Sequence, residues 1–268
     1  MTRSRNGTVY ELHGPADAPV AVLVHGLGLT RRMWDGFVPL VANDVRVLAY
    51  DLCGHGESAA SADEPSLTVL SEQLAALLDE LAVARAAIIG FSIGGMINRR
   101  FAMDHAPRVS SLVILNSPHE RSPEAQRLVE ERAAQTGAGG PAATIESTLD
   151  RWFTSPFRLG SPDVVARIRA GVLANDPDAY TGYRRVLASG VTELIRPVPP
   201  ITAPTLIMTC EHDSGSPPSM SFAIGSEIAG AEVEIVPGLQ HLGLIERPDL
   251  FAGPILRFLR RGRLPIRP

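Results

Sequence analysis

The sequence predicts an α/β fold in which a doubly wound, mostly parallel sheet carries an inserted helical cap. Short apolar runs rich in β-branched residues recur along the chain, and each has the length of a strand. Amphipathic helical patterns separate most of these runs, an alternation typical of a parallel sheet with helices on both faces. The alternation stops in one block near the middle of the chain, where helical patterns follow one another. This block is predicted to form the cap.

The apolar runs predict the strands of the sheet, because buried β-branched residues favour strands that are covered on both faces. Between them, leucines at helical spacing predict a helix over Leu70–Leu81, and a second helix over Met96–Asp104 follows a glycine-rich turn. The predicted strands, in chain order, are Val20–Val24, Val45–Tyr50, Ala87–Ile89, Leu112–Leu115, Thr205–Thr209 and Val233–Val236.

Residues 119–200 are predicted to form the helical cap, and residues 1–118 and 201–268 the core. A Ser-Pro pair at 117–118 precedes the block, and a proline cluster at 197–200 closes it. The block holds ten arginines and ten acidic residues. Its composition therefore shows no charge excess that would indicate a substrate.

Length and composition are those of an ordinary soluble globular protein. The 268 residues suffice for one large α/β domain with an inserted subdomain, and they are 45% hydrophobic and 20% charged, with a formal net charge of −4. A nucleic-acid partner is therefore not expected. The chain also lacks an apolar run of ~18 residues, so no membrane partner is expected either. We expect a cytoplasmic protein that acts on a small molecule; its oligomeric state is not indicated.

The absence of lysine and the scarcity of cysteine limit the reactions that the chain can catalyse. All 25 basic residues are arginine. Reactions that need a lysine amine, such as Schiff-base chemistry and P-loop phosphoryl transfer, are therefore excluded. Cys53 and Cys210 lack the spacing of a metal site and are expected to be reduced thiols, and His55 is interpreted as part of a structural turn. We expect no cofactor and no metal ion.

Ser92 lies between a predicted strand and a predicted helix. The pattern G-x-S-x-G occurs in many turns, but a nucleophile on a sharp strand-to-helix turn needs small residues two positions away on each side. Gly90 and Gly94 supply them. The first N–H groups of the helix, beginning at Ile93, would point toward negative charge that develops beside the hydroxyl. In this context the pattern indicates that Ser92 is a nucleophile.

A serine nucleophile needs a base, and the base needs a carboxylate that orients it. His241 lies in a loop between the last predicted strand and the C-terminal helix, and Asp213 follows the strand before it. Because parallel strands place functional loops at their carboxyl ends, Ser92, Asp213 and His241 are expected to meet there. Glu211 is an alternative for the acid.

The stretch His25–Gly28 follows a predicted strand and is a candidate oxyanion hole. In such an arrangement the backbone N–H of Leu27 would join that of Ile93 in binding the negative oxygen of a tetrahedral intermediate. A dinucleotide-binding fingerprint is excluded, because it needs a glycine three residues after Gly28, where Arg31 stands.

These motifs resemble those of α/β-hydrolases with a cap, in which the chain order of the triad is serine, acid, histidine. Within that superfamily the sequence is similar to 3-oxoadipate enol-lactonases and to related esterases and perhydrolases. Cys53 stands where these relatives usually carry arginine, and the enol-lactonases often have serine in place of His25. The stretches that carry the similarity are Leu27–Gly28, Arg32–Asp35, Asp51–Ser58 and Ser92–Met96.

The resemblance implies a cofactor-independent serine hydrolase that cleaves a small carboxylic ester or lactone through a triad of Ser92, His241 and Asp213. Haloalkane dehalogenases and epoxide hydrolases of this fold use an aspartate nucleophile, so those chemistries are disfavoured. Two alternatives stay open. One is hydrolysis of a carbon–carbon bond in an aromatic ring-cleavage product, and the other is a non-catalytic member that binds a small ligand.

Substrate contacts are expected from two regions. Arg31 and Arg32 follow the oxyanion segment and could bind a substrate carboxylate, although adjacent arginines are often solvated or packed along their stems. Aromatic residues of the cap, among them Trp152 and Tyr183, are expected to line the pocket or to form the core of the cap.

Overall fold

The computed structural model describes residues 1–261, apart from the side chains of residues 135–138. The six predicted strands are present, with ends shifted by a few residues. Two further strands precede them. Sequence patterns do not predict these two, because one has only two residues and the other mixes buried and polar positions. The strands are β1 (Thr2–Arg3), β2 (Val9–His13), β3 (Val20–Val24), β4 (Arg46–Tyr50), β5 (Ala86–Phe91), β6 (Val109–Leu115), β7 (Thr205–Cys210) and β8 (Glu232–Val236).

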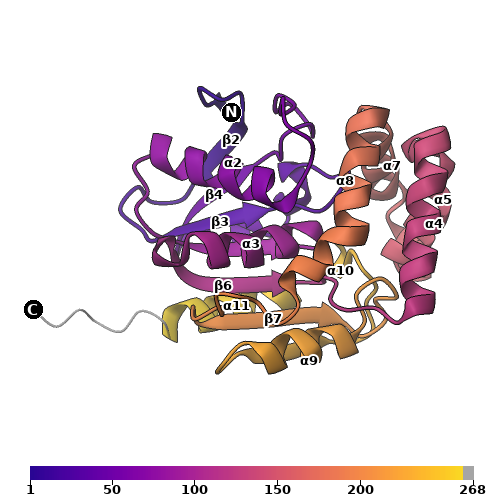
Figure 1. Cartoon of the computed structure of the whole chain (residues 1–268). Coiled ribbons are helices and arrows are strands. Elements are labelled where there is room, and N and C mark those ends of the chain that lie inside the picture. The colour runs from indigo at the N-terminus through magenta and orange to yellow at the C-terminus, as the bar shows by residue number, and fades with distance from the viewer. Residues whose placement is uncertain (262–268) are drawn as a thin grey trace, which may run out of the picture.

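The described strands form one eight-stranded sheet in the order β1-β2-β4-β3-β5-β6-β7-β8 (Figure 1). The six strands from β4 to β8 in this order run parallel to one another, whereas β1 and β2 add an antiparallel edge next to β4. The central strands β3, β5 and β7 are buried along almost their whole length. The predicted mostly parallel sheet is confirmed.

Helices cover both faces of the sheet. On one face α2 and α3 pack against each other, while α11 lies on the opposite face and contacts α1 (Figure 1). The helix predicted from Leu70 begins earlier, at Leu67, because the Ser66 hydroxyl accepts a hydrogen bond of 3.1 Å from the N–H of Val69 and caps the first turn. The core helices are α1 (Val38–Val41), α2 (Leu67–Glu80), α3 (Ile93–Asp104), α9 (Pro218–Glu227), α10 (Gly243–Glu246) and α11 (Asp249–Arg261).

Five helices lie between β6 and β7, inside the block predicted as the cap, and stand together at one end of the sheet (Figure 1). Within this block α4 packs against α8, and α5 against α7. The helices are α4 (Pro123–Gly139), α5 (Ile145–Trp152), α6 (Ser155–Gly160), α7 (Pro162–Leu173) and α8 (Pro177–Ser189). Short 3₁₀ helices cover Arg31–Trp34, Ala106–Arg108, Pro141–Ala143 and Gly190–Leu194.

The cap stands over the carboxyl ends of the parallel strands, toward which the arrows of β6 and β7 point in Figure 1. The segments that follow β3, β5, β7 and β8 therefore meet beneath the cap helices. Those segments carry the residues that sequence patterns single out for chemistry. Among the described residues, no helix is both long and apolar enough to cross a bilayer.

Candidate active site

Ser92 occupies a strained turn between β5 and α3. Its backbone φ is 57° and its ψ is −116°, a conformation that side-chain-bearing residues rarely adopt. The turn is tight enough to exclude larger neighbours. A Cβ atom on Gly90 would lie 2.1 Å from the carbonyl oxygen of Gly94, and one on Gly94 would lie 2.3 Å from that of Val24. Both glycines are therefore needed to hold the serine hydroxyl clear of the backbone.

Replacing Gly94 with alanine is expected to lower the free energy of unfolding by about 3 kcal/mol or more, because the added methyl group meets backbone atoms that cannot move aside. Gly171 in α7 offers a matched control, since a Cβ there would meet no atom within 4 Å. Gly171→Ala should leave stability unchanged or raise it by up to ~1 kcal/mol. Urea denaturation measures both variants, and equal unfolding free energies would contradict the steric account.

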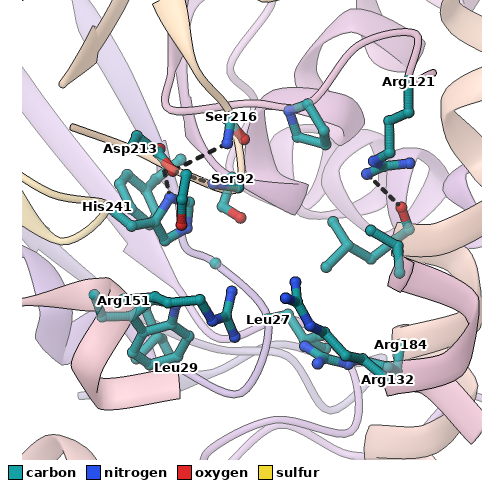
Figure 2. Close-up of a pocket in the computed structure, with 18 residues that line it drawn as sticks. Leu27, Leu29, Ser92, Arg121, Arg132, Arg151, Arg184, Asp213, Ser216 and His241 are labelled. Atoms are coloured by element: carbon teal, nitrogen blue, oxygen red, sulfur yellow. Dashed lines mark hydrogen bonds and ion pairs between the residues drawn. The ribbon is translucent and has the colours of Figure 1, made fainter. Parts of the chain in front are cut away.

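His241 and Asp213 form a short hydrogen bond, in which His241 Nδ1 lies 2.7 Å from Asp213 Oδ2 (Figure 2). The same oxygen accepts a hydrogen bond of 2.9 Å from Asn116 Nδ2. The other carboxylate oxygen accepts from the backbone N–H groups of Gly215 at 2.8 Å and Ser216 at 3.0 Å. Burial raises the pKa of Asp213, but the charge of His241 and these hydrogen bonds outweigh burial and leave the pKa lowered. The carboxylate is thus ionised and fixed in orientation.

The His241 ring lies beside Ser92 in a shared cavity (Figure 2). Phe91 packs against the ring with a centroid distance of 5.0 Å, and Trp152 of the cap approaches it at 6.2 Å. The alternative acid, Glu211, is exposed and accepts the backbone N–H of Gly238 instead. The structure therefore brings together the three predicted triad residues and not Glu211.

Of the two predicted oxyanion donors, Leu27 lines the cavity together with Ser92, and Ile93 follows Ser92 in the chain at the start of α3. Among the described residues neither N–H donates a hydrogen bond to another protein group. Ile93 begins α3, so its N–H belongs to the first turn, where helices leave donors unsatisfied. Neither N–H group is therefore committed to an acceptor within the described part of the chain.

His25 holds the peptide that carries the Leu27 N–H. Its Nδ1 lies 2.8 Å from the carbonyl oxygen of Gly26, which belongs to the same peptide group as that N–H. Its Nε2 accepts a hydrogen bond of 2.9 Å from the N–H of Leu52, so the ring proton is placed on Nδ1. The fully buried His25 thus orients one oxyanion donor from behind. Its place behind the oxyanion segment is a role that sequence patterns do not suggest.

Two buried histidines make stability sensitive to acid. Burial lowers the pKa of His25 to about 4 and that of His55 to about 3, while histidine in an unfolded chain titrates near ~6.5. The unfolded state therefore binds protons first as the pH falls. The free energy of unfolding should be constant just above pH ~6.5 and should decrease as the pH falls from ~6.5 toward ~4.

Urea denaturation at a series of pH values measures this loss. His212 is exposed, so His212→Gln serves as a control that should keep the same pH dependence. An unfolding free energy that stays constant between pH ~7 and ~5 would contradict the expectation.

The model of the Alpha/beta hydrolase family matches residues 21–253. The chain belongs to the α/β-hydrolase family. The crystal structure of an enol-lactonase from Burkholderia xenovorans LB400 is similar, with a TM-score of 0.87 and 30% identity over 94% of this chain and 96% of that one. A 3-oxoadipate enol-lactonase of Acinetobacter baylyi is 27% identical over 257 residues, 94% of this chain and 93% of its own. A protein of Variovorax paradoxus named for carbamate hydrolysis, RutD, is 27% identical over 96% of this chain and 97% of its own.

The cavity of this α/β-hydrolase is walled by arginines that sequence analysis does not single out. Their side chains come from the cap and point toward the space below Ser92 (Figure 2). The cap has equal numbers of arginines and acidic residues, so its composition does not indicate that several arginines face the cavity. Their arrangement depends on which face of each helix turns inward. They are Arg132 on α4, Arg151 on α5 and Arg184 on α8; Arg121, before α4, also lines the cavity but donates to the carbonyl oxygens of Leu187 and Ala188.

The expectation that Arg31 binds substrate is wrong. Its guanidinium group is buried away from the cavity, where it pairs with Asp51, with Glu11 at 3.1 Å and with Glu57 at 2.7 Å. These carboxylates satisfy the charge and tie together segments of the core. Arg32 does not line the cavity either, because its side chain is 59% exposed and lies 3.3 Å from Glu11.

The two predicted cap aromatics have different positions. Trp152 lines the cavity beside His241, as expected. Tyr183 is buried outside this cavity, where its hydroxyl lies 3.4 Å from Cys53 Sγ and its ring 4.9 Å from that of His55. The structure therefore contradicts a substrate contact by Tyr183, because the inward face of α8 presents Arg184 instead.

Nothing in the described part of the chain suggests a metal site, since no group of three or more His, Cys, Asp or Glu side chains is arranged to hold an ion. The chemistry that this site supports comes from a serine, a histidine–aspartate pair and two backbone donors.

Proposed function

We propose that this α/β-hydrolase cleaves a small carboxylic ester or lactone with Ser92 as the nucleophile. The observation that carries the proposal is the 2.7 Å hydrogen bond between His241 and Asp213 beside a serine held at a φ of 57°. The cavity measures about 80 Å³, well below the ~300–1,000 Å³ of sites for drug-sized ligands. A cavity of this size favours a small substrate.

In the acylation step, the Ser92 hydroxyl gives its proton to His241 Nε2 while its oxygen forms a bond to the substrate carbonyl carbon. The electron pair of the carbonyl moves onto oxygen, which accepts hydrogen bonds from the N–H groups of Leu27 and Ile93. The bond to the leaving oxygen then breaks, and that oxygen takes the proton from His241. Asp213 keeps the proton of the imidazole on Nδ1 and stabilises its charged form.

Deacylation repeats these steps with water. A water molecule gives a proton to His241, and the water oxygen attacks the acyl carbon of the ester on Ser92. Collapse of the second tetrahedral intermediate releases the carboxylic acid, and the proton returns from His241 to the serine oxygen. The cycle consumes one water molecule and needs no cofactor.

The relatives suggest which bonds to assay first. Proteins named as enol-lactonases support a lactone as the substrate, at 30% and 27% identity. The relative named for carbamate hydrolysis supports a second bond type, because the same triad could attack a carbamate carbonyl. We infer a reaction of the 3-oxoadipate enol-lactonase type in the bond that is cleaved, an ester or lactone, since both a curated relative and a solved structure support it.

An activity screen of the full chain tests the proposal. The screen includes short acyl esters, an enol-lactone, a carbamate and a ring-cleavage dienol, together with covalent labelling by a fluorophosphonate. Hydrolysis of an ester or lactone and an adduct on Ser92 are expected. Turnover of the dienol alone would favour carbon–carbon bond hydrolysis, and neither turnover nor adduct would favour a non-catalytic binding protein.

A further inference from the structure

Two of the cavity arginines, Arg151 and Arg184, lie on opposite sides of the space below Ser92 (Figure 2). Arg151 is the penultimate residue of α5, and the carbonyl oxygen of the last residue, Trp152, accepts a hydrogen bond of 2.8 Å from the N–H of Leu242, beside His241. Two hydrogen bonds of 2.8 and 2.7 Å from Thr154 to the Glu246 carboxylate hold the same junction. Arg151 is therefore placed against the histidine loop.

Arg184 is placed against the oxyanion segment. It lies one helical turn after Tyr180, whose ring packs so closely on Gly28 that a Cβ there would be 2.6 Å away. Asn175, just before α8, donates a hydrogen bond of 3.0 Å to the carbonyl oxygen of Gly28. Figure 2 shows Arg184 and Arg132 together on the side of the space that faces Arg151.

These side chains hold positive charge in a partly buried space. Burial, together with the charges of Arg132 and Arg184, lowers the pKa of Arg151 to about 10. Burial also lowers the pKa of Arg184. Asp213 attracts Arg151 from a distance, but its oxygens already accept from four other groups. The cavity lining contains no other carboxylate.

Neither Arg151 nor Arg184 forms an ion pair with any carboxylate of the described chain. Arg151 donates only to the carbonyl oxygen of Ser147 and the hydroxyl of Thr148, both at 3.2 Å. Elsewhere in the cap, acidic side chains pair with arginines that face outward. These outer pairs are Arg127 with Glu131, Arg158 with Asp150 and Arg169 with Glu146.

We propose that the substrate carries two carboxylates, one in the leaving group bound by Arg151 and one in the acyl part bound by Arg184. The inference rests on the proposed function, because His241, beside Arg151, protonates the leaving oxygen. One carboxylate would leave a guanidinium group unpaired on the far side of the cavity, and an unpaired buried charge is costly. Two carboxylates would neutralise both sides.

A matched set of four esters separates the two carboxylates. Ethyl butanoate has none, monoethyl succinate has one in the acyl part, butanoyl glycolate has one in the leaving group, and O-succinyl glycolate has both. Because a hydrogen-bonded charge pair contributes ~1.5–3 kcal/mol, each carboxylate should raise kcat/KM by about tenfold or more. Equal kcat/KM for the esters with one and two carboxylates would overturn the proposal.

Arginine variants show which side of the cavity binds which carboxylate. The intrinsic reactivity of each leaving group is the same in every variant, so a change between variants reports binding by the arginine. For the wild type, kcat/KM for butanoyl glycolate divided by kcat/KM for ethyl butanoate measures the effect of the leaving-group carboxylate. Arg151→Gln should lower this ratio by about tenfold. Arg184→Gln should lower the corresponding ratio for the acyl carboxylate. Arg127→Gln on α4 is the control, because Arg127 is exposed and paired with Glu131, and it should change neither ratio. The proposal is wrong if the two cavity variants change the opposite ratios or neither.

Binding to Ser92→Ala keeps this inference distinct from the proposed function. At constant ionic strength, O-succinyl glycolate should raise the Tm of Ser92→Ala more than monoethyl succinate does, and Arg184→Gln in that background should remove part of the shift. If the wild type hydrolyses ethyl butanoate as well as the anionic esters, the hydrolase proposal stands and this inference fails. If inorganic phosphate gives the same shift as O-succinyl glycolate, one dianionic group suffices and two carboxylates are not required.

Discussion

Ser92→Ala should lower kcat by at least ~10⁴-fold on any ester or lactone that the wild type hydrolyses, because the variant has no hydroxyl to form the acyl-enzyme. Residual turnover above the uncatalysed rate would come from the oxyanion donors and from substrate binding alone. Initial rates on the best substrate of the screen measure the effect, with circular dichroism to verify the fold.

Ser226→Ala is the matched control for this variant. Ser226 is exposed on α9, outside the cavity, and its hydroxyl donates only to the carbonyl oxygen of Ala223. It should retain wild-type turnover and fluorophosphonate labelling, whereas Ser92→Ala should lose both. Full activity in folded Ser92→Ala would show that another group is the nucleophile.

Asp213→Asn should produce the second large loss of kcat. An amide preserves the shape of the side chain but does not stabilise the charged imidazole, and it can donate to Nδ1 and so favour the tautomer that cannot accept the serine proton. Loss of the aspartate charge in such a triad lowers kcat by ~10⁴-fold. The pH profile of kcat is a second readout, because it reports the ionisation of the histidine that the aspartate supports.

Glu211→Gln separates the two candidate acids. Glu211 is exposed and accepts the N–H of Gly238 rather than a proton from His241. It should keep wild-type kcat while Asp213→Asn loses it. A large loss in Glu211→Gln together with an active Asp213→Asn would reverse the assignment.

The parallel sheet and the meeting of Ser92, Asp213 and His241 follow from local sequence. Buried β-branched runs form strands whether or not their partners are known, and parallel strands bring their carboxyl ends to one edge of the sheet. The glycines around Ser92 are likewise local, because a tight turn between a strand and a helix excludes side chains at those positions. The strand β2, second from the edge, is harder to predict, since its half-exposed positions lack a uniform pattern.

The electrostatic character of the site depends on tertiary structure. Sequence places Arg31 next to the oxyanion segment, but three carboxylates from distant parts of the core bind its guanidinium group. The cap sequence contains equal numbers of arginines and acidic residues. In the folded cap, however, Arg151 and Arg184 face the cavity, and acidic residues pair with arginines on the outer surface. The sequence by itself determined the framework of the proposed triad, because the strands and the tight turn that carry its residues are encoded locally. The tertiary structure alone decided which charges line the cavity, because the inward face of each cap helix is set by its packing.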